Sequence, residues 1–507
     1  MSFLALSLLS PIGAAAAPAP RADATPIDQR LAAALAQLDT LTTDAMARTG
    51  VPGVAVAVVH KGELVYAKGF GVRDVDTGEP VTPDTVFQLA SVSKSVGASV
   101  VAAAVGRGIV TWQDPVVEHL PWFELSDPYV TTHATIGDMY TMRSGLPGQA
   151  GDVLEAVGFN RRQILGRLDE LPLAPFRTLH QYTNFGLTVG AEAVAAAADK
   201  PWAVLSEELI YRPLGMTSTS SRYADFVARP NRSSLHVPVD GAYASLYRRD
   251  ADAQSPAGGV SSTVLDLSRW MSMEMAGGWY GGRQVVASKA LGKAQTPHSR
   301  TSPQTGGAQV PTGYGYGMGV SVSDTGRVHL AHSGAFSAGG GTAYLLIPAE
   351  QIGIVVLSNA LAGVPEAVYS AFGELVEKGE VSKDWVSFMA PRFQSFYAPD
   401  PTFAADEQPV DPEPARPLAD YVGTYANGFW GTVSVQSSGG RLSVTVGPDK
   451  VVIPLRHWTG DEFVGTFAAG DIPSDIGISF GGPRGKAATL TLGMGVGDAY
   501  VLSRLPG

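Results

Sequence analysis

Hydrophobic positions along the chain follow a strand period at both ends and a helix period in the middle. Leucines at helical spacing predict a helix over residues 28–48, and two short apolar runs at 54–59 and 64–67 predict a buried β-hairpin. Residues 90 to about 300 are mostly of helix and loop character. Strand character then returns in short apolar runs with turn signals between them, at 313–320, 326–330, 342–347 and 351–357.

A hairpin at the front and several strands at the back can share one sheet. The economical arrangement is an α/β (α+β) fold, in which a mixed sheet is assembled from both ends of the chain. Helices then lie on its faces, and a helical lobe is inserted between the two sets of strands. Residues 364–381 predict the helix that closes this domain.

The C-terminal part has a different pattern. Residues 396–417 are rich in Pro, Asp and Glu, which is typical of a linker. Residues 418–507 hold many short alternating runs separated by glycine-rich turns, and these predict a small antiparallel β-barrel. We therefore predict a main domain over 25–395, a linker over 396–417 and a barrel domain over 418–507.

Composition excludes several classes of function. The hydrophobic fraction is 45% and the charged fraction only 16%, which favours a large folded core. The net charge of -11, with no long basic run, argues against nucleic acid or an anionic membrane surface as a partner. The chain contains no cysteine, so disulfides, thiolate catalysis and cysteine zinc sites are excluded.

The first residues predict export. Residues 1–17 are apolar and end in Gly13 followed by four alanines, which suits the apolar core and cleavage site of a secretory signal. We predict a signal peptide and leader over 1–24, and a periplasmic or secreted location. A basic n-region is missing, because the first Lys or Arg is Arg21; a disordered leader is the alternative. The run is too short for an integral membrane span.

The candidate nucleophile is Ser91. It lies three residues before Lys94, a spacing that places both side chains on one face of a helix. A serine hydroxyl needs a nearby base before it can attack, and a lysine in a dry pocket has a lowered pKa and can be or support that base. The pair is the only Ser-x-x-Lys in the chain, and it fits an acyl-enzyme motif; four ordinary helix residues are the alternative.

Two further segments supply partners for this serine. Tyr182 can take the serine proton as a phenolate held beside an ammonium, and Asn184 can bind the substrate carbonyl and contact the lysine. His332 opens a stretch of small residues, where a substrate can approach the backbone closely. The backbone N–H groups of Ala335 and Ser91 can then form an oxyanion hole.

The ordered set Phe87–Lys94, Tyr182–Asn184 and His332–Gly334 resembles the serine β-lactamase and penicillin-binding-protein superfamily. It is closest to the class C-like branch, which includes D-aminopeptidases, D-stereospecific carboxypeptidases and family VIII-type esterases. Other stretches resemble the framework of that family, at 141–147, 211–216, 256–263 and 353–359. The resemblance covers roughly residues 30–380 and implies a β-lactamase/transpeptidase-like fold; the tail resembles the lipocalin-like barrel appended to some members.

The third motif departs from the penicillin-recognising pattern. No Lys-Thr-Gly or Lys-Ser-Gly occurs in the chain, and His332 stands where that lysine would be. A histidine is mostly neutral at pH 7 and binds a carboxylate less well than an ammonium does. In the family, H-x-G resembles the aminopeptidase and esterase members more than β-lactamases, although slow β-lactam turnover is still allowed.

These features predict an exported serine hydrolase that works through a Ser91 acyl-enzyme on small amides or esters, D-amino-acid peptides or esters in particular. Lys94 and Tyr182 relay the proton, and Tyr182 or His332 returns it to the leaving group. The predicted substrate-binding residues are Asn184, Ser333, Gly334 and Ala335. The alternatives are a β-lactamase or DD-carboxypeptidase, and a ligand-binding or sensor protein that has kept the pocket without turnover.

No cofactor, metal or nucleic acid is expected; the partner is a small molecule or short peptide, and a homo-oligomer is left open. The histidines show no metal-binding spacing. Residues 477–481 match the G-x-S-x-G nucleophile elbow, but no helix pattern follows, so we predict a barrel turn there. A second Y-x-N at 425–427 is predicted to be a strand end.

Overall fold

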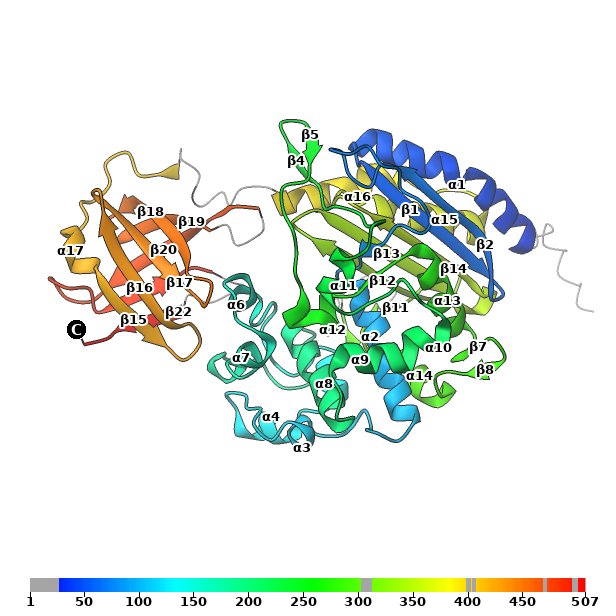
Figure 1. Cartoon of the computed structure of the whole chain (residues 1–507), viewed down its shortest axis with the longest axis horizontal. Coiled ribbons are helices and arrows are strands. Elements are labelled where there is room, and N and C mark those ends of the chain that lie inside the picture. Colours follow the sequence, from blue (N-terminus) through cyan, green and yellow to red (C-terminus); the bar gives the residue numbers. More distant parts are fainter. Residues whose placement is uncertain are drawn as a thin grey trace, which may run out of the picture.

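The computed structural model describes residues 27–301, 312–397, 403, 407–467, 472–494 and 500–506. Figure 1 shows a large body built around one sheet and a smaller barrel beside it. The predicted signal peptide and leader over 1–24 lie outside the described residues, as does part of the predicted linker. No helix among the described residues is long and apolar enough to cross a membrane.

The large body contains an eight-stranded sheet in the order β2-β1-β14-β13-β12-β11-β10-β9. Its strands are β1 (Gly53–His60), β2 (Glu63–Gly71), β9 (Ser299–Arg300), β10 (Gly313–Tyr314), β11 (Gly319–Val322), β12 (Val328–Phe336), β13 (Gly340–Ile347) and β14 (Ile352–Ser358). The front hairpin joins the back strands through β1 and β14, as the sequence predicted.

The direction of the strands corrects one expectation. Every pairing in this sheet is antiparallel, whereas a mixed sheet was expected. Short connections join β1 to β2, β12 to β13 and β13 to β14, and short connections can join only antiparallel neighbours. Strand β1 of the front hairpin also pairs with β14 in the antiparallel direction, with Val54 opposite Ser358 and His60 opposite Ile352.

Helices cover both faces of the sheet (Figure 1). On one face, α1 (Ile27–Thr49) packs against α15 (Val364–Lys378), and α16 (Trp385–Gln394) follows; the sequence predicted α1 and α15 but not α16. On the other face lie α2 (Val92–Gly106) and α13 (Val264–Met275). Successive β1 residues alternate between the two cores: Val56 packs with the α1 side and Ala57 with the α2 side.

The inserted lobe is helical. It contains α3 (Val116–His119), α4 (Pro128–His133), α5 (Ile136–Tyr140), α6 (Asp152–Ala156), α7 (Arg161–Leu165), η1 (Leu168–Glu170), α8 (Asn184–Ala197), α9 (Trp202–Ser206), η2 (Glu207–Tyr211), α10 (Arg212–Leu214), α11 (Tyr223–Val227), η3 (Asp252–Gln254), α12 (Ser255–Gly258) and α14 (Ser288–Ala294). Three short strand pairs lie outside the large sheet: β3 (Phe87–Gln88) with β6 (Ser261–Ser262), β4 (Val237–Val239) with β5 (Ala242–Ala244), and β7 (Trp279–Tyr280) with β8 (Arg283–Gln284).

A buried carboxylate ties this lobe together. Asp138 accepts hydrogen bonds from Arg143 at 2.8 Å and from Arg177 at 2.7 Å, and it also closes a capping box with Thr135 at the start of α5. These charged partners lower the pKa of Asp138 although burial opposes them. The bonds join α5 to the segment that leads into Tyr182.

The C-terminal domain is a closed eight-stranded barrel, as predicted. Its strands are β15 (Gly423–Asn427), β16 (Gly431–Ser438), β17 (Arg441–Val446), β18 (Val451–Thr459), β19 (Glu462–Phe467), β20 (Ser474–Gly481), β21 (Thr489–Leu492) and β22 (Tyr500–Arg504), preceded by α17 (Leu418–Tyr421). The G-x-S-x-G run lies inside β20, so the predicted turn at 477–481 is wrong. Tyr425, Trp430 and Phe463 are buried, so large side chains of the domain itself fill its core.

The barrel contacts the helical lobe through the β17–β18 turn (Figure 1). The backbone N–H of Asp449 donates to the carbonyl of Val157 at 3.2 Å. Gly447 has a φ of +70°, and a Cβ there would lie 2.2 Å from the Val157 oxygen, so this close approach requires glycine. The barrel therefore supports the loop directly after α6, one of the helices near the Ser91 cluster.

Candidate active site

Ser91 stands at the N-terminus of α2, a helix of 15 residues. Ala90, the residue before it, has a φ of +46°, a left-handed conformation that alanine rarely adopts. This strained turn places the Ser91 hydroxyl at the N-terminal end of α2. The positive end of the helix dipole there favours negative charge on the serine oxygen or on an oxyanion beside it.

Lys94 lies one turn further along α2 and is fully buried. Its ammonium nitrogen donates to the Ser91 hydroxyl at 3.0 Å, to the Asn184 side-chain oxygen at 2.6 Å and to the Ala257 carbonyl at 2.9 Å. Burial lowers the pKa of Lys94 to about 7, although the charge of Asp152 opposes the shift. A large fraction of Lys94 is therefore neutral near pH 7 and can accept the Ser91 proton.

Tyr182 is hydrogen-bonded to Ser91, and the Lys94 nitrogen lies 4.7 Å from the centre of its ring. Burial raises the pKa of the Tyr182 phenol well above its ordinary value. The raised pKa disfavours the Tyr182 phenolate that the sequence suggested. The Lys94 ammonium that would stabilise a phenolate is also partly deprotonated. The protonated phenol is suited instead to donate a proton to a leaving group.

His332 lies beside this cluster, with its ring centre 6.3 Å from that of Tyr182. Burial lowers the pKa of His332 to about 3, so the ring is neutral. Its Nδ1 is 2.6 Å from the Ser333 carbonyl, so Nδ1 carries the proton, and Nε2 accepts from the Tyr314 hydroxyl at 2.8 Å. The site therefore offers no permanent cation at the position of the missing lysine.

The edge of strand β12 lies against the Ser91 turn and borders the candidate site. β11 pairs with β12 only as far as Ala331, so the following residues pair with β13 alone. Gly334 lies directly against the serine turn: a Cβ there would be 2.9 Å from the Ser91 nitrogen and 2.4 Å from the Leu89 oxygen. This contact packs β12 against the backbone of the Ser91 turn, the region in which the sequence predicts a two-donor oxyanion hole.

Ser333 is the predicted site residue that points elsewhere. Adjacent residues of a strand face opposite sides, so Ser333 projects to the α15 face while His332 and Gly334 face α2. Its hydroxyl donates to Glu366 in the first turn of α15. The structure thus gathers Ser91, Lys94, Tyr182, Asn184 and His332 and places Gly334 beside them, but it leaves only the backbone of Ser333 near the site.

Several residues of the cluster were missed by the sequence reasoning. Asp152 accepts from the Asn184 amide at 2.8 Å, Tyr314 holds His332, and Ala257 binds the Lys94 nitrogen. A backbone carbonyl carries no sequence signal, and Asp152 lies in a turn-rich segment without a motif. Tyr314 belongs to a Gly-Tyr repeat at residues 313–316, a pattern that fits a core or pocket-wall position equally well.

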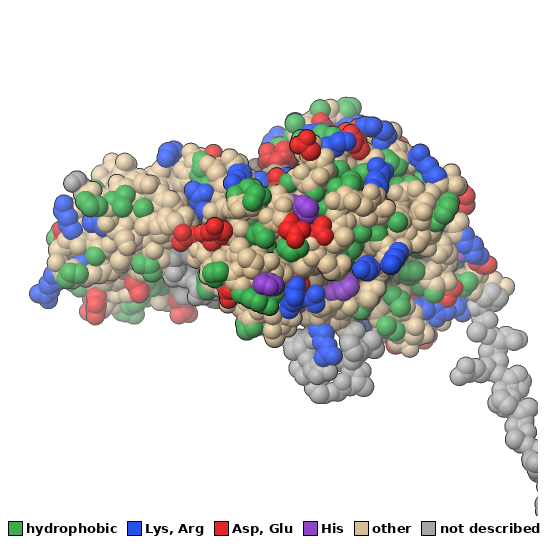
Figure 2. Space-filling model, turned by 90° about the horizontal axis from the view of Figure 1, so that it is seen from below, with side chains coloured by type: hydrophobic (Ala, Val, Ile, Leu, Met, Phe, Trp, Pro, Cys, Tyr) green, Lys and Arg blue, Asp and Glu red, His purple; other side chains and the backbone are tan. Residues whose placement is uncertain are grey.

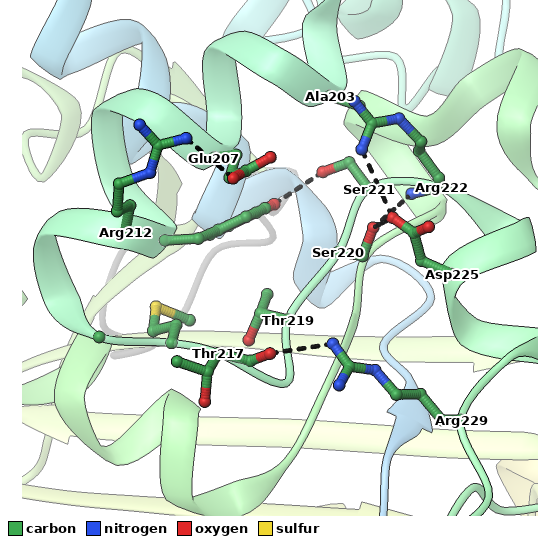
Figure 3. Close-up of a pocket in the computed structure, with 13 residues that line it drawn as sticks. Ala203, Glu207, Arg212, Thr217, Thr219, Ser220, Ser221, Arg222, Asp225 and Arg229 are labelled. Atoms are coloured by element: carbon green, nitrogen blue, oxygen red, sulfur yellow. Dashed lines mark hydrogen bonds and ion pairs between the residues drawn. The ribbon is translucent and has the colours of Figure 1, made fainter.

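Other features of the described residues do not extend this chemistry. No cluster of three potential metal ligands occurs in the described part of the chain. A pocket of about 330 Å³ lies between η2 and residues 217–229 (Figure 3). Its three arginines are already engaged: Arg212 with Glu207, Arg222 with Asp225, and Arg229 with the Thr217 carbonyl. On the face in Figure 2, acidic and basic side chains are interspersed, with no large basic patch.

The fold and the Ser91 cluster define a serine hydrolase. Residues 38–375 match the family model described as Beta-lactamase, and residues 407–499 match a domain of unknown function, DUF3471. The chain belongs to the beta-lactamase family, which the motifs at Ser91, Tyr182 and His332 suggested.

Relatives within this family carry different activities. The chain is 25% identical to the unguisins hydrolase ungD of Aspergillus violaceofuscus, over 94% of this chain and 89% of that protein. It is 29% identical to esterase EstB of Burkholderia gladioli, over 38% of this chain and 53% of that protein. The octameric penicillin-binding protein homologue from Pyrococcus abyssi shares the fold with a TM-score of 0.60 and 19% identity, over 92% of this chain and 99% of that one.

The lowered pKa of Lys94 predicts the pH dependence of acylation. If Lys94 is the base, only its neutral form accepts the serine proton, so kcat/KM for an uncharged ester should be level above pH 7 and fall by about tenfold per pH unit below it. Initial rates with p-nitrophenyl propionate between pH 5 and 9 measure this, with circular dichroism at each pH as a control for unfolding. A flat profile would contradict the assignment of Lys94 as the base.

Proposed function

We propose that this chain is an exported serine hydrolase that acts through a Ser91 acyl-enzyme on small amides or esters, with D-amino-acid peptides or esters as the substrate class. The observation that supports it most is the Lys94 nitrogen, which is hydrogen-bonded to both Ser91 and Asn184 in a buried cluster. The export part rests on the apolar, alanine-ending sequence of residues 1–17 alone.

In the proposed reaction, the Ser91 oxygen bonds to the substrate carbonyl carbon while its proton passes to neutral Lys94. The negative oxygen that forms is held by the backbone N–H groups of Ser91 and Ala335. The bond to the leaving amine or alcohol then breaks. Tyr182 supplies the proton that this group takes up, and Lys94 passes the proton from Ser91 to Tyr182, so both return to their starting states. Water attacks the acyl-enzyme, releases the acid and returns the proton to Ser91.

A neutral His332 argues against a carboxylate-bearing substrate on that side of the site. Penicillins and C-terminal D-alanine peptides carry a carboxylate, and a neutral imidazole held by Tyr314 offers it no charge. A β-lactamase or DD-carboxypeptidase is therefore the second candidate. A ligand-binding protein without turnover is the candidate from another class, and the hydrogen bond between the Ser91 hydroxyl and the buried Lys94 amine disfavours it.

A panel of chromogenic substrates tests the proposal. We expect hydrolysis of p-nitrophenyl propionate and D-alanine p-nitroanilide, with kcat/KM for nitrocefin at least about 100-fold lower, because a lost charge-assisted contact costs about 1.5–3 kcal/mol and the β-lactam carboxylate would also need desolvation. Labelling by a fluorophosphonate reports on the nucleophile independently of substrate choice. Fast nitrocefin turnover would reverse the order of the candidates, and absence of both labelling and turnover would favour the binding protein.

A further inference from the structure

Helix α6 lies on the side of the lobe that faces the barrel (Figure 1). It contains five residues, and its N-cap, Gly151, has no side chain that could accept from the first backbone N–H groups. A helix this short is not stable by itself, because so few hydrogen bonds do not offset the cost of nucleation. Contacts with the rest of the molecule must therefore hold α6 in place.

The first residue of α6, Asp152, holds the side chain of Asn184. Its Oδ2 accepts from the Asn184 amide nitrogen at 2.8 Å. The amide oxygen is thereby turned toward Lys94, from whose nitrogen it accepts at 2.6 Å. A flipped amide would instead point N–H donors at the Lys94 nitrogen. Asp152 therefore sets the orientation in which Asn184 holds the lysine beside Ser91.

The other end of α6 is held by the barrel. Val157 is the C-cap residue of this helix, and its carbonyl accepts from the backbone N–H of Asp449, in the β17–β18 turn, at 3.2 Å. The last carbonyls of a helix have no partner within the helix, so this donor from the barrel satisfies one of them. The Val157 side chain is buried in one hydrophobic cluster with Val446 of β17.

Two glycines make this contact close from both sides. A Cβ at Gly447 of the turn would lie 2.2 Å from the Val157 oxygen and 2.6 Å from the Val157 Cβ. A Cβ at Gly158, after α6, would lie 2.3 Å from the carboxylate carbon of Asp449. The Val157 oxygen is a backbone atom that cannot rotate away. A displacement of the β17–β18 turn therefore moves the end of α6.

We propose that the barrel domain supports the active site: its β17–β18 turn fixes the end of α6 and so holds Asp152 where it orients Asn184. This inference rests on the proposed hydrolase function and gives a role to the domain that matches DUF3471. Gly447 and Asp449 are positioning residues, and Ser91 remains the nucleophile. A barrel filled by its own large side chains is suited to act as a rigid support.

Two glycines of the barrel with similar backbone conformation test the proposal. Gly447 has a φ of +70° beside Val157, whereas Gly440 has a φ of +75° and no atom within 4 Å of an added Cβ. Alanine strains the backbone at both positions, so both variants should melt at a similarly lowered temperature. Single-turnover acylation by p-nitrophenyl propionate should fall by about 10- to 100-fold in Gly447→Ala, the usual cost of misplacing a group at a site. In Gly440→Ala it should stay within about twofold of wild type.

A double-mutant cycle separates positioning from a general loss of stability. Asp152→Ala removes the acceptor that holds Asn184 and should itself slow acylation by about tenfold or more. If the turn acts through Asp152, adding Gly447→Ala to Asp152→Ala should slow the reaction by less than about twofold further. Val157→Ala loosens the same contact from the lobe and leaves the barrel unchanged, so it should slow acylation even if Gly447→Ala does not fold.

Hydrogen–deuterium exchange follows α6 without reference to activity. The peptide covering residues 149–160 should exchange faster in Gly447→Ala than in Gly440→Ala. Equal exchange and equal acylation in these two variants would overturn the proposal, while ester turnover by the wild type would keep the hydrolase function. Effects of Gly447→Ala and Asp152→Ala that multiply in the double variant would also overturn it. A wild-type protein that neither reacts with a fluorophosphonate nor hydrolyses the ester would contradict the hydrolase function and this inference together.

Discussion

Ser91→Ala is expected to abolish fluorophosphonate labelling and to lower kcat for p-nitrophenyl propionate by about 10⁴-fold or more, the usual result of removing a catalytic nucleophile. The reason is chemical, because no acyl-enzyme can form without the hydroxyl. The fold should persist, since Lys94 keeps its bonds to Asn184 and Ala257 after losing the one to Ser91. Labelling followed by mass spectrometry of the active-site peptide gives the measurement.

A buried serine within α2 provides the matched control. Ser95 donates to the Gly317 carbonyl at 2.7 Å and accepts from the Tyr344 hydroxyl at 2.9 Å, so it is a structural hydroxyl on the same helix. Ser95→Ala should lower stability by about 1–3 kcal/mol and keep labelling at Ser91. Labelling that survives in Ser91→Ala would place the nucleophile elsewhere, and the proposed function would be wrong.

Gly334→Ala is expected to lower kcat by about 10²–10³-fold, as does the loss of an oxyanion-hole donor. The added Cβ would lie 2.4 Å from the Leu89 oxygen and 2.9 Å from the Ser91 nitrogen, both of them backbone atoms that cannot rotate away. β12 and the serine turn must then separate, which pulls the two N–H donors apart. Single-turnover acylation of p-nitrophenyl propionate measures the chemical step directly.

An added methyl group also lowers stability by overpacking. A second glycine of the same sheet therefore separates the loss of stability from the loss of acylation rate. At Gly353 on β14 a Cβ would meet only side-chain atoms, the nearest being Leu346 Cδ2 at 3.0 Å and Val59 Cγ2 at 3.1 Å. Gly353→Ala should lower the melting temperature, since overpacking costs about 1–3 kcal/mol, and leave acylation unchanged. Equal acylation rates in the two variants would show that the contact between Gly334 and Ser91 does not hold the oxyanion hole.

The elements that depend on local sequence were predictable. The leucine spacing of α1, the apolar runs of β1 and β14 and the alternation in the barrel each follow from the period of the backbone. The motif at Ser91 and Lys94 was also visible, because a nucleophile and its base one helical turn apart are close in sequence as well as in space. The Tyr182 and His332 segments could be assigned by resemblance, but their distance from Ser91 could not.

Only the tertiary structure decided how the site is charged. Lys94 has a lowered pKa and Tyr182 a raised one because the packed core removes water from both, and burial depends on contacts between residues far apart in the chain. The sequence left open which of the two is the base. Pairing of β12 with β13 turned the Ser333 side chain away, and folding of the lobe brought Asp152 onto Asn184. Sequence patterns therefore determined the elements and the candidate nucleophile, whereas desolvation and the facing of strand residues, which exist only in the assembled fold, determined the charge and arrangement of the candidate site.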